Sequence, residues 1–237
     1  MKKIVLATVC VCVMAGAVFA QGSVNWSTIA FNAGTAVTNT SISPLFGGTG
    51  VGGTVGPTVT TADAFYYEIL YMPTTTTFGT APTATSLFNG TWQDAGLSAL
   101  NATTSAGRLS VTGANAVNNA TVPWSPGTTD NIVMVGWSAS LGTTWLAVSN
   151  ELATRSYITA LAGQAGFFGV STVGYITTLA VGTAPGSTVF GTANTVEGTP
   201  IDSLNTPLYA LPVPEPATMA LAGLGGLSLL LFRRRKS

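Results

Sequence analysis

Carboxylates are the side chains of this 237-residue sequence that could do acid–base chemistry, because it contains no histidine and its two cysteines, Cys10 and Cys12, lie near the N-terminus. Two carboxyl groups across a cleft could serve a glycoside hydrolase, and Glu68 with Asp94 or Asp130 could form such a pair. The acids show no motif spacing, so a solvated surface role is the simpler interpretation. The seven acids between residues 21 and 213 are Asp63, Glu68, Asp94, Asp130, Glu151, Glu197 and Asp202.

A glycine-rich run contains the spacing G-x-G-x-x-G at Gly48, Gly50 and Gly53. In a dinucleotide-binding protein this fingerprint lies between a strand and a helix whose N-terminus holds the pyrophosphate. The residues that follow, 54–57, include Gly56 and Pro57 and cannot begin such a helix. The run is therefore interpreted as a surface loop.

Two further patterns fall short of a catalytic or metal site. The segment 136–140 resembles a nucleophile elbow, but Ser140 replaces the second glycine and no histidine is available as a base. Oxygen ligands for Ca²⁺ could come from Asp130 and Asn131 or from Asp202, yet the spacing of a calcium loop is absent. The sequence predicts no enzyme, no cofactor and no metal site.

Five tryptophans could either pack in a core or stack on sugar rings. Their dispersal along apolar segments favours the core. The alternative, a carbohydrate-binding module that uses exposed aromatic side chains, requires two or more of them to share one exposed face. The tryptophans are Trp26, Trp92, Trp124, Trp137 and Trp145.

The charges divide between the chain ends and the body. Six of the eight basic residues lie within a few residues of the termini, and residues 21–213 hold only Arg108 and Arg155 against seven acids, a net charge of −5. A nucleic-acid-binding protein needs a basic surface to neutralise phosphates. Nucleic acid is therefore excluded as a partner.

The body must place these residues on strands. Gly or Pro recurs every 8 to 15 residues between short β-branched and aromatic runs, which predicts an all-β, antiparallel sandwich or jelly-roll-like single domain. Phe65, Tyr67, Ile69 and Tyr71 share one face by the period of two, and Val133, Val135 and Trp137 form a similar set. The predicted strands are 24–31, 64–72, 108–112, 131–138, 143–148, 167–173, 175–181 and 187–192.

One helix is predicted at 150–162. Asn150 is its cap, Glu151 and Arg155 form an i, i+4 pair, and Gly163 terminates it. Its apolar stripe comprises Ala153, Tyr157, Ala160 and Leu161.

The first twenty residues form a secretory signal. Lys2 and Lys3 precede an apolar run that ends in Val18-Phe19-Ala20, the small-residue pattern that signal peptidase recognises. Cleavage is expected between Ala20 and Gln21.

The C-terminus has three parts in order. Pro214-Glu215-Pro216 precedes the segment 217–232, which has no charge over 16 residues and would be about 24 Å long as a helix. The segment ends in a basic cluster that marks the cytoplasmic side of a membrane helix, Arg233, Arg234, Arg235 and Lys236.

This tripartite tail resembles the PEP-CTERM family of exported bacterial proteins. The resemblance covers about 24 residues and implies that an exosortase, a membrane protease-transpeptidase, acts near Pro214-Glu215-Pro216. It also implies transient anchoring in the inner membrane of a Gram-negative-type bacterium, followed by transfer to the cell surface or extracellular matrix, often in an exopolysaccharide context. The family's exported bodies mostly have no assigned activity, so the resemblance adds no site within the body.

Four segments follow: a signal peptide at 1–20, an exported β domain at 21–205, a proline-rich linker at 206–213 and a sorting and anchoring segment at 214–237. The expected role is structural or adhesive, in an exopolysaccharide or biofilm context. The expected partners are signal peptidase, an exosortase-type enzyme, the membrane and exopolysaccharide.

Overall fold

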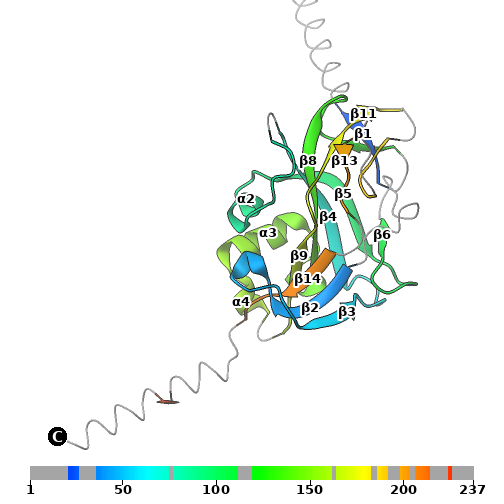
Figure 1. The fold of residues 1–237 in the computed structure, drawn as a ribbon. Coiled ribbons are helices and arrows are strands. Elements are labelled where there is room, and N and C mark those ends of the chain that lie inside the picture. Colours follow the sequence, from blue (N-terminus) through cyan, green and yellow to red (C-terminus); the bar gives the residue numbers. More distant parts are fainter. Residues whose placement is uncertain are drawn as a thin grey trace, which may run out of the picture.

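Strands dominate the fold (Figure 1). The computed structural model describes residues 21–26, 36–74, 77–111, 119–161, 164–182, 186–191, 198–202, 206–213 and 224–225. The strands are β1 (Gly22–Asn25), β2 (Ala36–Ile42), β3 (Thr54–Pro57), β4 (Phe65–Met72), β5 (Gln93–Asn101), β6 (Leu109–Val111), β7 (Ala120–Val122), β8 (Thr129–Ser138), β9 (Phe167–Val170), β10 (Gly174–Thr177), β11 (Leu179–Ala180), β12 (Ser187–Thr188), β13 (Gly198–Thr199) and β14 (Thr206–Ala210). The helices are η1 (Pro44–Phe46), α2 (Ala84–Phe88), η2 (Ala139–Leu141), α3 (Trp145–Thr154) and α4 (Tyr157–Ala160).

The larger of two sheets has the strand order β3-β2-β14-β9-β8-β4-β5-β6, with β10 attached to β8 and β13 to β10. β8 lies at its centre and runs antiparallel to β4 from the pair Phe65 and Ser138 to the pair Met72 and Asn131. β14 pairs with β2 in parallel, so the prediction of a purely antiparallel sheet is wrong here. The all-β prediction itself is confirmed.

The smaller sheet has the order β11-β1-β12, and β7 also pairs with β1. The chain passes from the large sheet to the small one at Thr178, between β10 and β11. The Thr178 N–H donates to the carbonyl of Thr128 at 3.1 Å and its hydroxyl donates to the carbonyl of Ser125 at 2.6 Å. These bonds satisfy the buried polar groups at the crossing.

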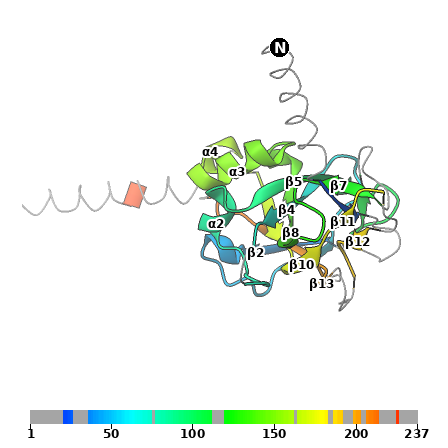
Figure 2. The same cartoon turned by 90° about the horizontal axis from the view of Figure 1, so that it is seen from above.

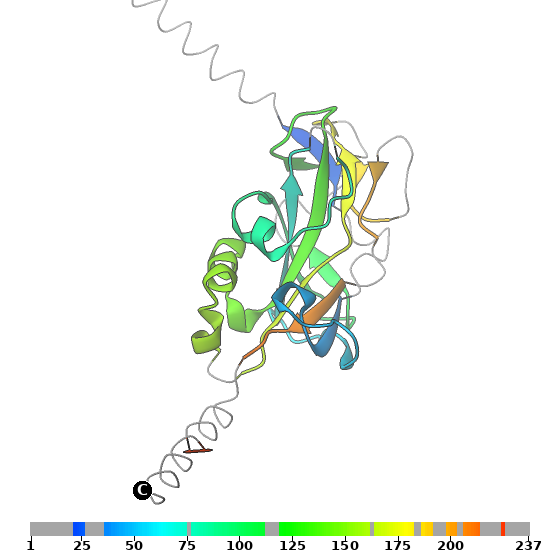
Figure 3. The same cartoon turned by 60° about the vertical axis from the view of Figure 1, so that its left-hand side comes forward.

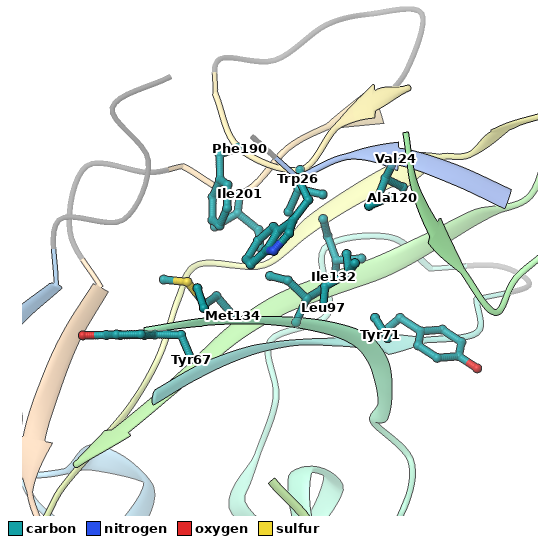
Figure 4. Packing of buried hydrophobic residues seen from close by; sticks show 14 of the residues in the cluster. Val24, Trp26, Tyr67, Tyr71, Leu97, Ala120, Ile132, Met134, Phe190 and Ile201 are labelled. Carbon is teal, nitrogen blue, oxygen red and sulfur yellow. The ribbon is translucent and has the colours of Figure 1, made fainter. Parts of the chain in front are cut away.

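One hydrophobic core lies between the two sheets (Figure 4). Trp26 follows β1 and is fully buried, with its ring centroid 5.1 Å from that of Phe190. From the large sheet, β4 contributes alternate residues, and all four that the period of two placed on one core face belong to this cluster. That prediction is confirmed.

A second core lies on the opposite face of the large sheet, under α2, α3 and α4 (Figures 2 and 3). Val133, Val135 and Trp137 of β8 point into it, as the alternation predicts. The intervening residues of β8, such as Ile132 and Met134, belong to the first core, so this strand is buried on both faces. The described part of the body therefore has three layers: a small sheet, a large sheet and a helical layer.

The helical layer begins earlier than predicted. Trp145 to Val148 form the first turn of α3, so the predicted strand at 143–148 is wrong. The side chain of Thr144 accepts a hydrogen bond from the N–H of Ala147 at 3.4 Å and acts as the N-cap in place of Asn150. Capping by a threonine hydroxyl outweighs the β propensity of the residues around it.

Two helices replace the single predicted one. Arg155 adopts a left-handed conformation, with φ of 58°, and ends α3, after which α4 begins at Tyr157. Tyr157 and Leu161 are buried, as predicted, whereas Ala153 and Ala160 are exposed. The predicted terminator Gly163 lies outside the described residues.

The remaining predicted strands are found in shortened form, and several strands had not been predicted. β6, β9, β11 and β12 fall within the segments at 108–112, 167–173, 175–181 and 187–192, and β10 overlaps 175–181 but begins at Gly174. β1 ends at Asn25, and residues 27–31 lie outside the described part of the chain. The strands that the sequence did not predict are β2, β3, β5, β7, β13 and β14.

The predicted linker at 206–213 contains strand β14. Thr206–Ala210 pairs with both β2 and β9. The N–H of Leu211 then donates to the carbonyl of Gly166 at 2.9 Å, and its side chain is buried in the second core. Residues 206–211 are therefore part of the folded body.

A pair of glycines lets β14 approach. Gly136 of β8 and Gly169 of β9 are cross-strand partners. A Cβ on Gly169 would lie 2.1 Å from the carbonyl oxygen of Pro207, and one on Gly136 would lie 2.6 Å from the ring of Tyr67. Only glycine leaves room for both contacts.

Candidate functional site

The sorting residues predicted from the sequence lie outside the described residues. This holds for Pro214, Glu215 and Pro216, for the basic cluster 233–236 and for Ala20. Gln21, the first described residue, is exposed. Val213 therefore ends the described body only two residues after the packed side chain of Leu211.

Within the residues that the structure describes, no helix has the length and apolar character needed to span a membrane.

The glycine-rich run is a loop, as predicted. It connects η1 to β3, so a strand and not a helix follows Gly53. Gly50 and Gly53 have φ of 67° and 68°, the left-handed conformation that favours glycine in turns. The loop thus lacks the helix N-terminus that a pyrophosphate site requires.

The serines at the end of β8 form a structural network. The hydroxyls of Ser138 and Ser140 lie 2.9 Å apart, and Ser138 accepts a hydrogen bond from the N–H of Phe167 at 2.9 Å. The hydroxyl of Ser140 donates to the carbonyl of Ala165. These bonds fix the start of β9 and explain the serines without a nucleophilic role.

All five tryptophans are buried, with exposed fractions between 0% and 7%. The preferred interpretation, core packing, is confirmed, and the condition for a carbohydrate-binding face built from tryptophans is not met. Of the aromatic side chains that the structure describes, Phe78 is strongly exposed, at 47%, and it stacks on Tyr175 at 5.1 Å.

Asp130 and Asn131 hold a loop in place. The carboxylate of Asp130 accepts the N–H of Thr74 at 3.0 Å, while Asn131 accepts the N–H of Gly79 at 2.8 Å and donates to Thr74 and to the carbonyl of Thr77. Burial raises the pKa of Asp130, and the Thr74 N–H opposes that effect. Among the described residues, no group of three acidic, histidine or cysteine side chains is placed to bind a metal.

Among the described residues, the fold brings Glu68 near Asp94. Glu68 lies on β4 and faces the helical layer, and Asp94 lies near the start of β5, the neighbouring strand. The two side chains are close enough for the negative charge of Asp94 to raise the pKa of Glu68. Asp130 does not join them, so one of the two pairs considered from the sequence forms.

The Glu68 carboxyl sits at the N-terminus of α3. The backbone N–H of Trp145 acts on this carboxyl, while Oε2 is buried without a hydrogen-bond partner. Burial, and after it the charge of Asp94, raises the pKa of Glu68 to about 7, against the N–H of Trp145, which lowers it. The sequence could not reveal this environment, since the helix that supplies the N–H begins 77 positions later.

Asp94 borders a pocket of about 430 Å³ between α2 and α3, which we call the α2–α3 pocket. Its volume falls in the range of small-molecule sites. The residues lining it include Phe88, Trp92, Asp94, Trp145, Ser149 and Asn150. Sequence reasoning missed this pocket because the strand predicted at 143–148 would have removed the first turn of α3.

In the part of the chain that the structure describes, a β body ends at Val213, just before the segment that contains Pro214-Glu215-Pro216. Residues 212–236 match the family model of the PEP-CTERM protein-sorting motif, which confirms the resemblance drawn from the sequence. The motif implies a bacterial protein that is exported and processed by an exosortase at the membrane. Neither the curated proteins nor the solved structures contain a match to the chain.

Proposed function

We propose that this protein is a structural or adhesive component of the cell surface or of an exopolysaccharide or biofilm matrix, to which an exosortase-type system delivers it. The N-terminal signal directs export, and the C-terminal segment anchors the chain in the inner membrane until it is processed. Signal peptidase and the exosortase are its processing partners.

The character of the body's surface carries this proposal. Residues 36–62, which include β2, the glycine-rich loop and β3, contain no charged side chain, and Thr40, Thr49, Thr54 and Thr60 are exposed among them. Threonine hydroxyls both donate and accept hydrogen bonds, so such a surface can contact hydrated polymers that offer hydrogen-bond donors, acceptors or both. The segment has no charge that would repel an acidic polysaccharide.

We further propose that the body is not an enzyme. Histidine is absent from the sequence, and the carboxyl pair Glu68 and Asp94 includes an oxygen, Glu68 Oε2, that is buried. A general acid must reach the substrate atom that it protonates. The environment of Glu68 supports a structural role at the start of α3.

A localisation experiment tests the proposal. Cells that express the full chain, or a chain ending at Val213, are fractionated, and their matrix is collected. We expect the full chain on the surface or in the matrix and the truncated chain in the periplasm or medium. If removal of the body alone leaves biofilm mass and matrix cohesion unchanged, the structural or adhesive role is wrong, although sorting itself would stand.

Surface proteolysis gives a second readout. Between Gln21 and Val213 trypsin can cut only after Arg108 and Arg155, both exposed. Two backbone hydrogen bonds hold Arg108 in place: its N–H donates to the carbonyl of Ser105, and its carbonyl accepts the N–H of Ala102. We expect most of the body to survive trypsin treatment of whole cells, and its substantial loss would contradict the claim of resistance.

A further inference from the structure

The α2–α3 pocket combines aromatic walls with one acidic residue. Phe88, Trp92 and Trp145 contribute the aromatic surface, and Asp94 contributes the carboxylate. Trp145 is held in place by Phe168, whose ring stacks on it at 6.2 Å with an interplanar angle of 17°. No lysine or arginine is found among the described residues that line the pocket. The walls are thus rigid and carry a negative charge.

Two of the polar side chains that line the pocket, Asp94 and Ser149, offer hydrogen-bond acceptors. One oxygen of Asp94 accepts the N–H of Gly96 at 2.7 Å, and a carboxylate has lone pairs for several further bonds. The Ser149 hydroxyl donates its proton to the carbonyl of Leu146 at 3.1 Å, so its oxygen can only accept from a ligand. A ligand that satisfies these two residues must therefore donate hydrogen bonds.

The charge around the pocket favours a cation. Asp94 lies close enough to Glu68 for its charge to oppose ionisation of that carboxyl. A positive group beside Asp94 would offset this repulsion, because opposite charges favour the ionised form of nearby carboxyls. The faces of aromatic rings also attract cations, because the ring quadrupole is negative there.

We propose that the α2–α3 pocket binds a primary ammonium group carried on an apolar chain or on a sugar ring. The ammonium has three N–H donors and one positive charge, and it pairs with Asp94 and donates to Ser149. The ring or chain that carries it packs against Phe88 and Leu146, the large apolar side chains of the lining that are not buried. This site is independent of the proposed matrix role, because it requires neither sorting nor a polymer.

Titration calorimetry with two matched pairs of probes tests the proposal on the full exported chain in detergent. Hexylammonium is compared with hexanol, and a glucosamine tetramer with the N-acetylglucosamine tetramer. Within each pair the size is similar and only the ammonium differs. We expect at least one ammonium probe to bind about tenfold or more tightly than its neutral partner, which is the value of one charge-assisted hydrogen bond. The pair that shows the difference identifies the carrier, chain or ring.

Variants assign the binding to this pocket. Asp94→Asn should weaken ammonium binding about tenfold, whereas Asp63→Asn, the same change at an exposed turn with φ of 55°, should not alter it. Leu146 lines the pocket and is 73% exposed, so Leu146→Lys cannot unfold the core and should weaken binding by repulsion, with Leu146→Gln as the neutral control. Equal binding of ammonium and neutral probes, or ammonium binding that neither Asp94→Asn nor Leu146→Lys weakens, overturns the proposal.

Discussion

The carboxyl of Glu68 on β4 lies near the backbone N–H of Trp145, the first residue of α3, and this N–H lowers the pKa of the carboxyl. Glu68 thus lies where the helical layer meets the large sheet. The first N–H groups of a helix have no partner within the helix, and a carboxylate there also interacts favourably with the helix dipole. Oε2 is buried without a hydrogen-bond partner, so ionisation of Glu68 lowers the stability of the fold. The stability of the fold therefore depends on pH.

Glu68→Gln should remove that pH dependence. The pKa of Glu68 is about 7 in the folded protein and near 4.5 in the unfolded chain, so the folded state binds more protons between these pH values. The free energy of unfolding therefore falls as the pH rises through this window, by about 1 to 3 kcal/mol.

Urea unfolding followed by tryptophan fluorescence at pH 4.5 and 8 should show a smaller fall for Glu68→Gln. Asp130 also has a raised pKa, so the difference between the two proteins, and not the slope of either, reports on Glu68. Identical pH profiles would contradict the assignment.

Asn131→Ala should release the backbone at Thr77 and Gly79 and the side chain of Thr74. Its fully buried side chain satisfies the N–H of Gly79, the hydroxyl of Thr74 and the carbonyl of Thr77. Leaving these groups without partners should lower the free energy of unfolding by about 2 to 4 kcal/mol. Asn89→Ala is the matched control, because Asn89 is exposed and bonds only locally to the N–H of Thr91. A loss no larger than that of the control, measured by urea unfolding, would show that the loop does not depend on Asn131.

Gly169→Ala should destabilise the contact between β9 and β14. The added Cβ would lie 2.1 Å from the carbonyl oxygen of Pro207, a backbone atom that cannot move without shifting β14. We expect a loss of about 3 kcal/mol in thermal or urea unfolding. Gly90→Ala meets nothing within 4 Å but has φ of 86°, so it should cost only about 1 kcal/mol. A smaller loss for Gly169→Ala than for Gly90→Ala would refute the packing of β14 against β9.

Processing should leave β14 intact. The carbonyl of Ala210 accepts the N–H of Ser43 at 3.1 Å, and Leu211 is bonded to Gly166 and buried, so a protease must unfold this edge to reach it. We expect the intact mass of the protein recovered from the cell surface to correspond to a chain that begins at Gln21 and retains Val213. A mature form that ends before Leu211, or one that still carries Arg233 to Ser237, would contradict this expectation.

The sequence revealed the elements whose pattern is local. The period of two in β4 marks its core face because adjacent side chains of a strand point to opposite sides. In β8 the set Val133, Val135 and Trp137 was recognised in the same way. The sequence did not show that the residues between them are also buried, since that depends on a second sheet packing on the other face.

The sequence misled where a distant residue decides the local structure. Residues 143–148 have the β-branched and aromatic composition of a strand, but Thr144 caps a helix there and the Glu68 carboxyl lies near the N–H of Trp145. β14 was missed because Pro207 suggests a linker. Pro207 pairs with Val37 of β2, and β14 pairs with β9 only from Tyr209 onward.

The sequence alone therefore identified the sorting segment, which the family model matches at residues 212–236. Such a segment is a short, contiguous pattern of proline, apolar and basic residues, so it can be recognised without knowledge of the tertiary structure. Tertiary structure alone decided what the body offers. It buried all five tryptophans, placed Glu68 beside Asp94 under α3, and formed the α2–α3 pocket between segments more than fifty residues apart. Such contacts depend on how sheets and helices pack, and this information is spread over the whole chain.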